Sequence, residues 1–232
     1  MKLLLTSGGV KNESISHALV DLLGKPISES HALIVPTGIY PFPRGGENAR
    51  ALIAGHSKSP LSELGWASLG VLELTALPTI RRENWVPVLE KTDALLVWGG
   101  NVMYLRYWLM MSGVAELVPQ LPNLVYVGVS AGSIVTTRHN CDEEFNRQFA
   151  PDGSDMLVGG EKGLGWVDCA LTVHLDHPDP IFEDHTTEKI EAWARGIPDP
   201  TYALDDESAL VVTNGEIRVV SEGHWHRFEP AS

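Results

Sequence analysis

Short apolar segments alternate with amphipathic ones along most of the chain. The apolar segments are rich in branched side chains and are often bounded by glycine or proline, a pattern typical of buried strands. We predict such strands at residues 2–6, 31–36, 69–74, 94–98, 124–127, 169–175, 202–204, 209–213 and 217–220. Helical spacing of apolar residues predicts helices at 14–23, 48–64, 82–90, 103–113 and 186–195, with another beginning near 134. Strands that alternate with helices indicate an α/β fold with a mainly parallel sheet covered on both faces.

Length and patterning indicate a single domain over residues 1–232. The chain of 232 residues is long enough to bury a sizeable core, and it contains no repeat or long linker. Residues 138–163 are rich in polar side chains and glycine, and we interpret them as an excursion from that domain. Asn214-Gly215 separates the last two predicted strands, which strongly indicates a tight hairpin.

Charge, apolar patterning and cysteine content argue against nucleic-acid binding, a transmembrane helix, a signal peptide and a cysteine metal site. The formal net charge is −13 and no Lys/Arg cluster stands out, so nucleic acid is not an expected partner. No apolar run approaches the ~18 residues of a transmembrane helix. The apolar start, residues 1–5, is too short for a signal peptide. The two cysteines, Cys141 and Cys169, lack metal-ligand spacing and suit a reducing cytoplasm.

A Gly-x-Ser-x-Gly turn follows the predicted strand at 124–127. Its residues are Gly128, Ser130 and Gly132. A strand, a sharp turn and a helix form the context in which a nucleophilic serine is presented at the tip of a turn. The first N–H groups of the following helix would point to the same place, where they are able to stabilise an oxyanion. The alternative is a glycine-rich turn whose serine has no chemical role.

A second glycine-rich turn, Gly99-Gly100-Asn101, ends the predicted strand at 94–98. In a parallel sheet both turns lie at the same edge, so we expect them to meet. Glycine allows the backbone to approach a ligand closely, and one N–H of the pair is a candidate second oxyanion donor. We expect Gly99 and Asn101 to bind substrate. The simpler interpretation is an ordinary strand-ending turn.

A nucleophilic serine needs a base, and His174 is the best placed of the nine histidines. It follows the apolar run 170–173, so its orientation is restrained while its ring is able to reach a cleft. His177, farther into the loop, is the rival. A metal site is a weaker alternative because no HExxH-like spacing is present. That alternative would use His174, Asp176, His177, Asp179 and His185, and we expect no metal.

An acidic segment, Asp205-Asp206-Glu207, lies between two later predicted strands. Acidic residues in such a bend are usually solvated turn formers. Here they complete the chain order Ser, His, acid, and one of them is a candidate to orient the histidine. This order differs from the Ser, acid, His order of α/β-hydrolases.

Together these motifs resemble the peptidase E (α-aspartyl dipeptidase) and cyanophycinase family of serine peptidases. The resemblance spans nearly the whole chain and rests on four motifs in the family's order: Gly99-Gly100-Asn101, Gly128-Val129-Ser130-Ala131-Gly132, Val173-His174-Leu175 and Ala203-Leu204-Asp205-Asp206-Glu207. It implies a class I glutaminase-like fold, a three-layer αβα sandwich with a mainly parallel central sheet. It also implies a triad of Ser130, His174 and Asp206, with oxyanion donors at the N–H groups of Gly100 and Ala131.

The chain departs from that family at two places. The aspartyl dipeptidase has a glutamate where this chain has Asp206, and a shift of one residue would place Glu207 there. The aspartyl dipeptidase also has an arginine for its substrate's carboxylate, whereas residues 185–189 offer only Lys189. Lysine is not equivalent to arginine in carboxylate recognition, so strict specificity for N-terminal aspartate is not expected.

The resemblance therefore implies a cytoplasmic hydrolase, a serine peptidase that cleaves small peptides as a dipeptidase through an acyl-enzyme, without a cofactor. The enzymatic alternative is an amidohydrolase acting on a non-peptide amide. Glutaminases of this fold use cysteine at the turn, so Ser130 argues against their chemistry. The non-enzymatic alternative is a small-molecule binding protein of the same fold. We expect a small peptide as substrate, no nucleic acid or membrane partner, and a monomer or homodimer.

Overall fold

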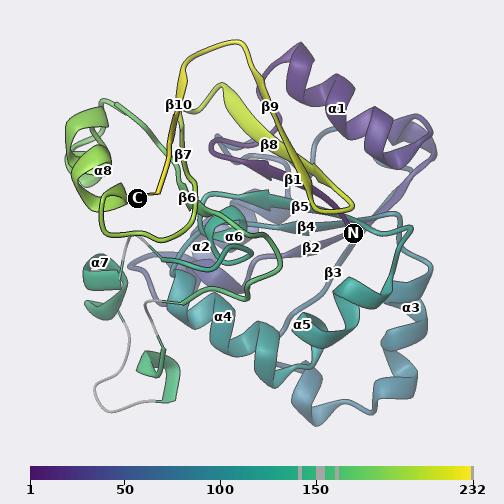
Figure 1. The fold of residues 1–232 in the computed structure, drawn as a ribbon. Coiled ribbons are helices and arrows are strands. Elements are labelled where there is room, and N and C mark those ends of the chain that lie inside the picture. Colours follow the sequence, from purple (N-terminus) through teal and green to yellow (C-terminus); the bar gives the residue numbers. More distant parts are fainter. Residues whose placement is uncertain (141–142, 150–154, 160–161, 231–232) are drawn as a thin grey trace.

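The computed structural model describes residues 1–140, 143–149, 155–159 and 162–230 and contains a central sheet of seven strands (Figure 1). The strand order is β3-β2-β4-β5-β1-β8-β9. The strands are β1 (Lys2–Thr6), β2 (His31–Val35), β3 (Ser68–Val71), β4 (Ala94–Val97), β5 (Val125–Val129), β8 (Ser208–Thr213) and β9 (Glu216–Ser221). β1 to β5 are parallel, and β8 and β9 continue the sheet as antiparallel strands. The predicted α/β fold with a mainly parallel sheet is confirmed.

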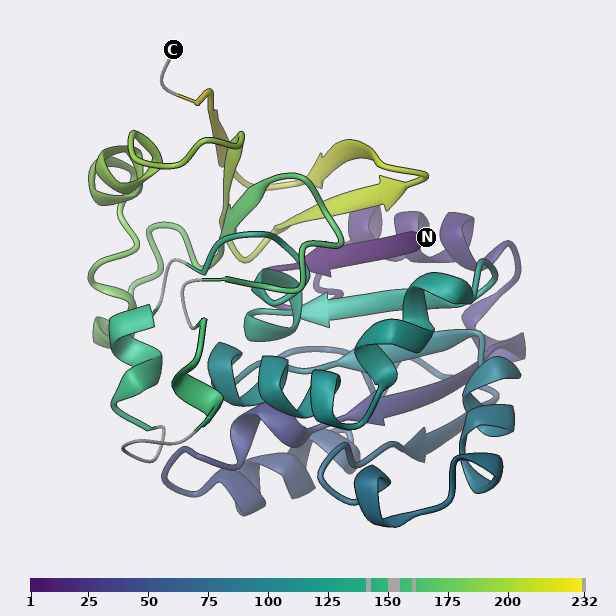
Figure 2. The ribbon, with the colours of Figure 1, turned by 60° about the horizontal axis from the view of Figure 1, so that its bottom comes forward.

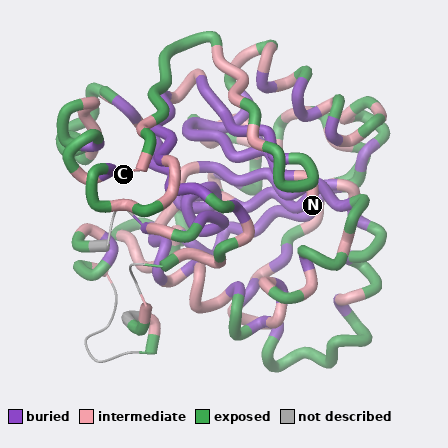
Figure 3. The backbone as a smooth tube through the Cα atoms, in the orientation of Figure 1, coloured by how far each residue is buried: buried purple, intermediate pink, exposed green. Residues whose placement is uncertain are grey.

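Helices cover both faces of this sheet. They are α1 (Glu13–Leu23), α2 (Gly45–Ile53), α3 (Val86–Glu90), α4 (Val102–Met111), α5 (Val114–Leu117), α6 (Ala131–Ile134), α7 (Glu143–Arg147) and α8 (Thr187–Ala194). Side chains alternate between the faces of a strand, so Leu4 packs with the apolar sides of α1 and α2. Leu3 and Leu5 pack on the opposite face, with α3 to α6. The result is the expected αβα arrangement, with the buried strands between two helical layers (Figures 2 and 3).

Three further strands form a small second sheet beside the central one, in the order β10-β7-β6. They are β6 (Ala170–Thr172), β7 (Thr201–Leu204) and β10 (Trp225–Phe228). β10 was not predicted, because its side chains are mostly exposed and give no apolar alternation. It is an edge strand stabilised by backbone pairing with β7, with Trp225 opposite Leu204.

Several predicted boundaries differ from the structure. The helix predicted at 48–64 is α2, which begins at Gly45 and ends at Ile53; Gly55 then adopts φ 71°. The strand predicted at 169–175 ends at Thr172. The helix predicted at 82–90 is a 3₁₀ turn followed by α3. The hairpin prediction is correct: Asn214 and Gly215, with φ 52° and 85°, connect β8 to β9.

The two cysteines differ in what the structure says about them. Cys169 is a buried free thiol, and burial raises its pKa to about 12. Cys141 lies outside the described residues. Among the described residues, every helix is too short or too polar to cross a lipid bilayer.

Candidate active site

Ser130 occupies the sharp turn between β5 and α6. Its backbone has φ 53° and ψ −119°, a conformation dominated by glycine and strained for a residue with a Cβ atom. The two flanking glycines are required by close packing. A Cβ atom on Gly128 would lie 2.5 Å from the carbonyl oxygen of Gly132, and one on Gly132 would lie 2.1 Å from that of Val97. The predicted strand–turn–helix context is therefore present, with Ser130 at its tip.

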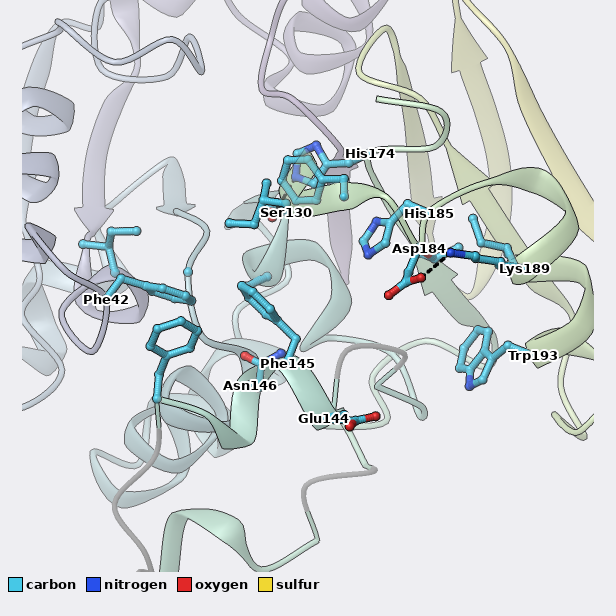
Figure 4. Close-up of a pocket in the computed structure, with 18 of the residues that line it drawn as sticks. Phe42, Ser130, Glu144, Phe145, Asn146, His174, Asp184, His185, Lys189 and Trp193 are labelled. Carbon is cyan, nitrogen blue, oxygen red and sulfur yellow. Dashed lines mark hydrogen bonds and ion pairs between the residues drawn. The ribbon is translucent and has the colours of Figure 1, made fainter. Parts of the chain in front are cut away.

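His174 connects Ser130 to an acidic residue. Its Nε2 lies 3.0 Å from Ser130 Oγ, and its Nδ1 lies 2.7 Å from Asp206 Oδ1. Figure 4 shows Ser130 and His174 next to each other. A carboxylate only accepts hydrogen bonds, so Nδ1 carries the proton that is shared with Asp206, and Nε2 is left to accept from Ser130. Phe182 stacks on one face of the imidazole ring, with the two ring centroids 4.2 Å apart.

The backbone of His174 is also unusual. It lies two residues beyond the end of β6 and has φ 58°. Its N–H donates to Ser7 Oγ at 2.9 Å, and the same hydroxyl donates to Asp206 Oδ1 at 2.8 Å. Ser7 follows β1 directly, so one side chain links His174, Asp206 and the central sheet.

Asp206 lies in the turn between β7 and β8 and has a third partner. Its Oδ2 accepts from Lys11 Nζ at 2.7 Å. Burial by itself would raise the pKa of Asp206, but hydrogen bonds from His174, Lys11 and Ser7 and the charge of His174 outweigh it. The pKa of this carboxyl is therefore held well below its ordinary value, so the group is charged at neutral pH.

The two neighbours of Asp206 point elsewhere. The carboxylate of Asp205 accepts the backbone N–H of His224 at 2.7 Å and also bonds the Ser208 hydroxyl. Glu207 Oε2 accepts from the Asn12 side chain at 3.0 Å. Of the three acidic residues, Asp206 is therefore the one that reaches His174.

The structure also shows where His177, the rival base, and the residues of the metal alternative lie. His177 Nε2 lies 3.7 Å from Asp206 Oδ2, next to the acid, while its Nδ1 accepts from the N–H of Asp179. The Nδ1 of His185 donates to the carbonyl of Val173 at 2.6 Å. Within the described ranges, no group of three or more His, Cys, Asp or Glu side chains converges in a way suited to a metal ion.

The turn after β4 lies against the serine turn, as its position in the sheet predicted. A Cβ atom on Gly99 would lie 3.0 Å from Ser130 Cβ. Gly100 has φ 128°, and a Cβ atom there would lie 2.1 Å from the carbonyl oxygen of Gly38. Glycine is needed at Gly100, because its φ and the Gly38 carbonyl leave no room for a side chain, and Gly99 brings the backbone close to the side chain of Ser130.

Asn101 has a structural partner on either side. Its side chain is fully buried, accepts the N–H of Tyr104 at the start of α4 and donates to the carbonyl of Asn146 in α7. It therefore caps one helix and holds another. Gly100 and Ala131 line the cavity at Ser130, whereas Gly99 and Asn101 are not among the described residues that line it.

A cavity of about 840 Å³ opens above Ser130. Its apolar lining is Ile39, Phe42, Pro43, Phe145, Phe149, Ile181, Phe182, Ile190 and Trp193, and its polar lining beside the serine and histidine is Asn48, Glu144, Asn146, Thr172, Asp184, His185 and Lys189. Lys189 forms a hydrogen-bonded ion pair with Asp184 (Figure 4). The hydrogen bond from Lys189 lowers the pKa of Asp184. No arginine lies in the described lining, and the exposed Arg44 pairs with Glu47.

Residues 3–220 match the model of peptidase family S51. The chain belongs to peptidase family S51. Since this is a family of serine peptidases, the protein is a serine peptidase, as the resemblance implied. No curated protein sequence matches the chain significantly.

Two solved structures share the fold of this chain over nearly its whole length. A protein from Listeria monocytogenes EGD-e, described as peptidase E, is 18% identical with a TM-score of 0.65, covering 96% of this chain and 98% of that one. A peptidase from an acI-B1 actinobacterium is 16% identical with a TM-score of 0.65, covering 100% of this chain and 95% of that one. At these identities the likeness establishes the fold.

Sequence reasoning missed Ser7, Lys11 and most of the aromatic lining. Ser7 had a recognisable pattern, because Ser7-Gly8-Gly9 ends a predicted strand as the two other glycine turns do. Lys11 and the phenylalanines had none, because their positions depend on how loops return over the edge of the sheet.

Proposed function

We propose that this S51 peptidase hydrolyses small peptides, as a dipeptidase, through an acyl-enzyme formed on Ser130. The observation that carries the proposal is the hydrogen-bonded series Ser130–His174–Asp206, which begins at a strained turn facing a cavity. The volume of about 840 Å³ is within the range of small-molecule sites, which favours a short substrate.

In the first half of the reaction, Ser130 Oγ attacks the carbonyl carbon of the scissile peptide bond and His174 Nε2 takes the hydroxyl proton. The N–H groups of Gly100 and Ala131 donate to the oxyanion; neither donates to another described residue. The C–N bond then breaks, and His174 gives its proton to the departing amine.

In the second half, a water molecule loses a proton to His174 and attacks the acyl ester. The ester bond to Ser130 breaks, the serine recovers its proton, and the acid product leaves. Asp206 keeps the imidazole in the productive tautomer and stabilises its charged form. Ser7 and Lys11 act through Asp206 and are positioning residues.

Strict specificity for N-terminal aspartate is not part of the proposal. Such specificity requires a cation that pairs with the substrate's side-chain carboxylate. The described lining offers Lys189, which already pairs with Asp184, and no arginine. A desolvated carboxylate without a partner typically costs several kcal/mol.

The test combines covalent labelling with hydrolysis. A fluorophosphonate is expected to label the wild-type protein at Ser130, located by peptide mass spectrometry, and to leave Ser130→Ala unlabelled. Purified wild-type protein is expected to release free amino acids from a dipeptide panel. A labelled protein that cleaves aminoacyl amides but no dipeptide would favour the non-peptide amidohydrolase. An unlabelled, inactive protein would favour a binding protein.

A further inference from the structure

Three phenylalanines form a cluster on one wall of the cavity. Phe42 lies in the loop before α2, Phe145 lies in α7, and Phe149 follows α7. The ring centroids are 4.3 Å apart for Phe42 and Phe149, 5.4 Å for Phe145 and Phe149, and 5.8 Å for Phe42 and Phe145. Two segments distant in sequence therefore build one aromatic surface.

This surface remains partly open to the cavity. All three side chains are only half-buried, although each contacts the other two. Phe182 lines the same cavity, so four of the chain's five phenylalanines are there. Removing aromatic surface from water is favourable, so this wall would stabilise an apolar group bound against it.

Lys189 and Asp184 lie on another side of the serine, whereas the other charged residue near the wall, Glu144, precedes Phe145 in α7. In Figure 4, Phe42 lies on one side of Ser130, whereas His185, Asp184 and Lys189 lie on the other. The cation of the described lining, Lys189, is thus both away from Phe42 and paired with Asp184. A carboxylate at the aromatic wall would lose water without gaining a cation to pair with.

The direction of the reaction relates these two sides to the two parts of a substrate. His174 must deliver a proton to the departing amine, so the departing residue lies on the histidine side. That side carries Phe182, stacked on His174, and His185. The residue whose carbonyl is attacked then extends from Ser130 away from His174, toward the wall of Phe42, Phe145 and Phe149.

We propose that this wall binds the side chain of the acyl-side residue and makes the enzyme selective for a large apolar or aromatic residue there. For a dipeptide this is the N-terminal residue. The inference rests on the proposed function, and it adds the class of substrate. Offset and edge-to-face contacts with the three rings would favour phenylalanine over alanine, and both over aspartate.

The experiment compares kcat/KM for Phe-Leu, Ala-Leu and Asp-Leu with purified wild-type protein. The departing residue is the same in all three, so differences report on the acyl side. Phe-Leu is expected to exceed Ala-Leu about thirtyfold, equivalent to about 2 kcal/mol of transition-state discrimination. The reversed pair Leu-Phe and Leu-Ala is expected to differ less, because the departing side chain does not reach this wall.

Variants test the wall itself. Phe42→Ala is expected to lower the ratio of kcat/KM for Phe-Leu to that for Ala-Leu about tenfold. Phe149→Ala provides a second test if Phe42→Ala does not fold. The matched control is Trp225→Ala, an exposed aromatic side chain on β10 outside the cavity lining, which is expected to leave the Phe-Leu to Ala-Leu ratio unchanged.

Failure of the inference differs from failure of the proposed function. A protein that labels at Ser130 and hydrolyses dipeptides, yet prefers Ala-Leu or Asp-Leu, overturns the inference alone. The same holds if both phenylalanine variants lower activity toward Phe-Leu and Ala-Leu equally. A protein that neither labels nor hydrolyses any dipeptide overturns the proposed function and the inference with it.

Discussion

The backbone of Ser130 permits a test that separates strain from chemistry. Its φ of 53° and ψ of −119° match a turn position normally occupied by glycine. Replacing Ser130 with glycine removes the Cβ atom that causes the strain, whereas alanine keeps it. Both variants lose the hydroxyl, so both are expected to lose peptidase activity. They are expected to differ in stability, with Ser130→Gly the more stable.

The magnitude follows from two opposing terms. Strain at such a position costs about 1–3 kcal/mol, and glycine relieves it. Glycine also gives the unfolded chain more freedom, which costs about 0.4–1 kcal/mol relative to alanine. The lost hydrogen bond to His174 Nε2, 3.0 Å long, is common to both variants and cancels. Ser130→Gly should therefore exceed Ser130→Ala by about 1–2 kcal/mol in free energy of unfolding.

Urea denaturation at pH 7 measures this difference, and thermal unfolding provides a second readout. For a chain of this length, 1–2 kcal/mol corresponds to about 2–8 °C in Tm. Ser133 supplies the matched control, since it is buried in α6 only three residues away. There Ser133→Gly should be less stable than Ser133→Ala by about 1 kcal/mol, because glycine is a poor helix former. A glycine variant less stable than alanine at both positions would refute the argument from strain.

Three further predictions concern the base, the acid and specificity. His174→Ala should lose dipeptide hydrolysis, while His177→Ala at equal folded concentration should keep most of it; the reverse result would make His177 the base. The pKa of Asp206 lies below the ~3.9 of an unfolded aspartate, so its contribution to stability is present above about pH 4 and declines as the pH falls below that. Lys11→Met should therefore be less stable than wild type at pH 7, and the difference in urea midpoint should shrink only below about pH 3; a difference that stays the same down to about pH 2 would contradict this. Finally, kcat/KM for Asp-Leu should not exceed that for Asn-Leu more than about a hundredfold, or about 2.7 kcal/mol.

The parts of the fold that sequence could predict are those where side-chain pattern follows burial. β1, β2, β4 and β5 lie in the middle of the sheet, so their apolar runs are continuous. β6 and β7 were recognised as strands, but nothing in their composition indicated that they form a second sheet. The third strand of that sheet, β10, was not predictable either, because its exposed side chains give no pattern.

The site shows the same limit at the level of single residues. Ser130 and Gly100 were predictable because strand-ending turns of a parallel sheet meet at one edge. The wall of Phe42, Phe145 and Phe149 was not, because it forms only when the loop before α2 meets α7. Residues 138–163, interpreted as a polar excursion, thus supply α7 and two aromatic side chains of the cavity.

The acidic segment shows why a correctly recognised motif does not by itself identify which carboxylate bonds His174. Asp205, Asp206 and Glu207 are adjacent and chemically alike, so composition does not rank them. Their directions differ because the turn between β7 and β8 sends each side chain to a different neighbour. Asp205 bonds the backbone before β10, Glu207 bonds Asn12 at the start of α1, and Asp206 lies between Lys11 and His174. The partners come from three distant segments, so choosing among the acids requires the tertiary structure, and exchanging Asp206 for Glu should misplace the carboxylate even though its charge is kept.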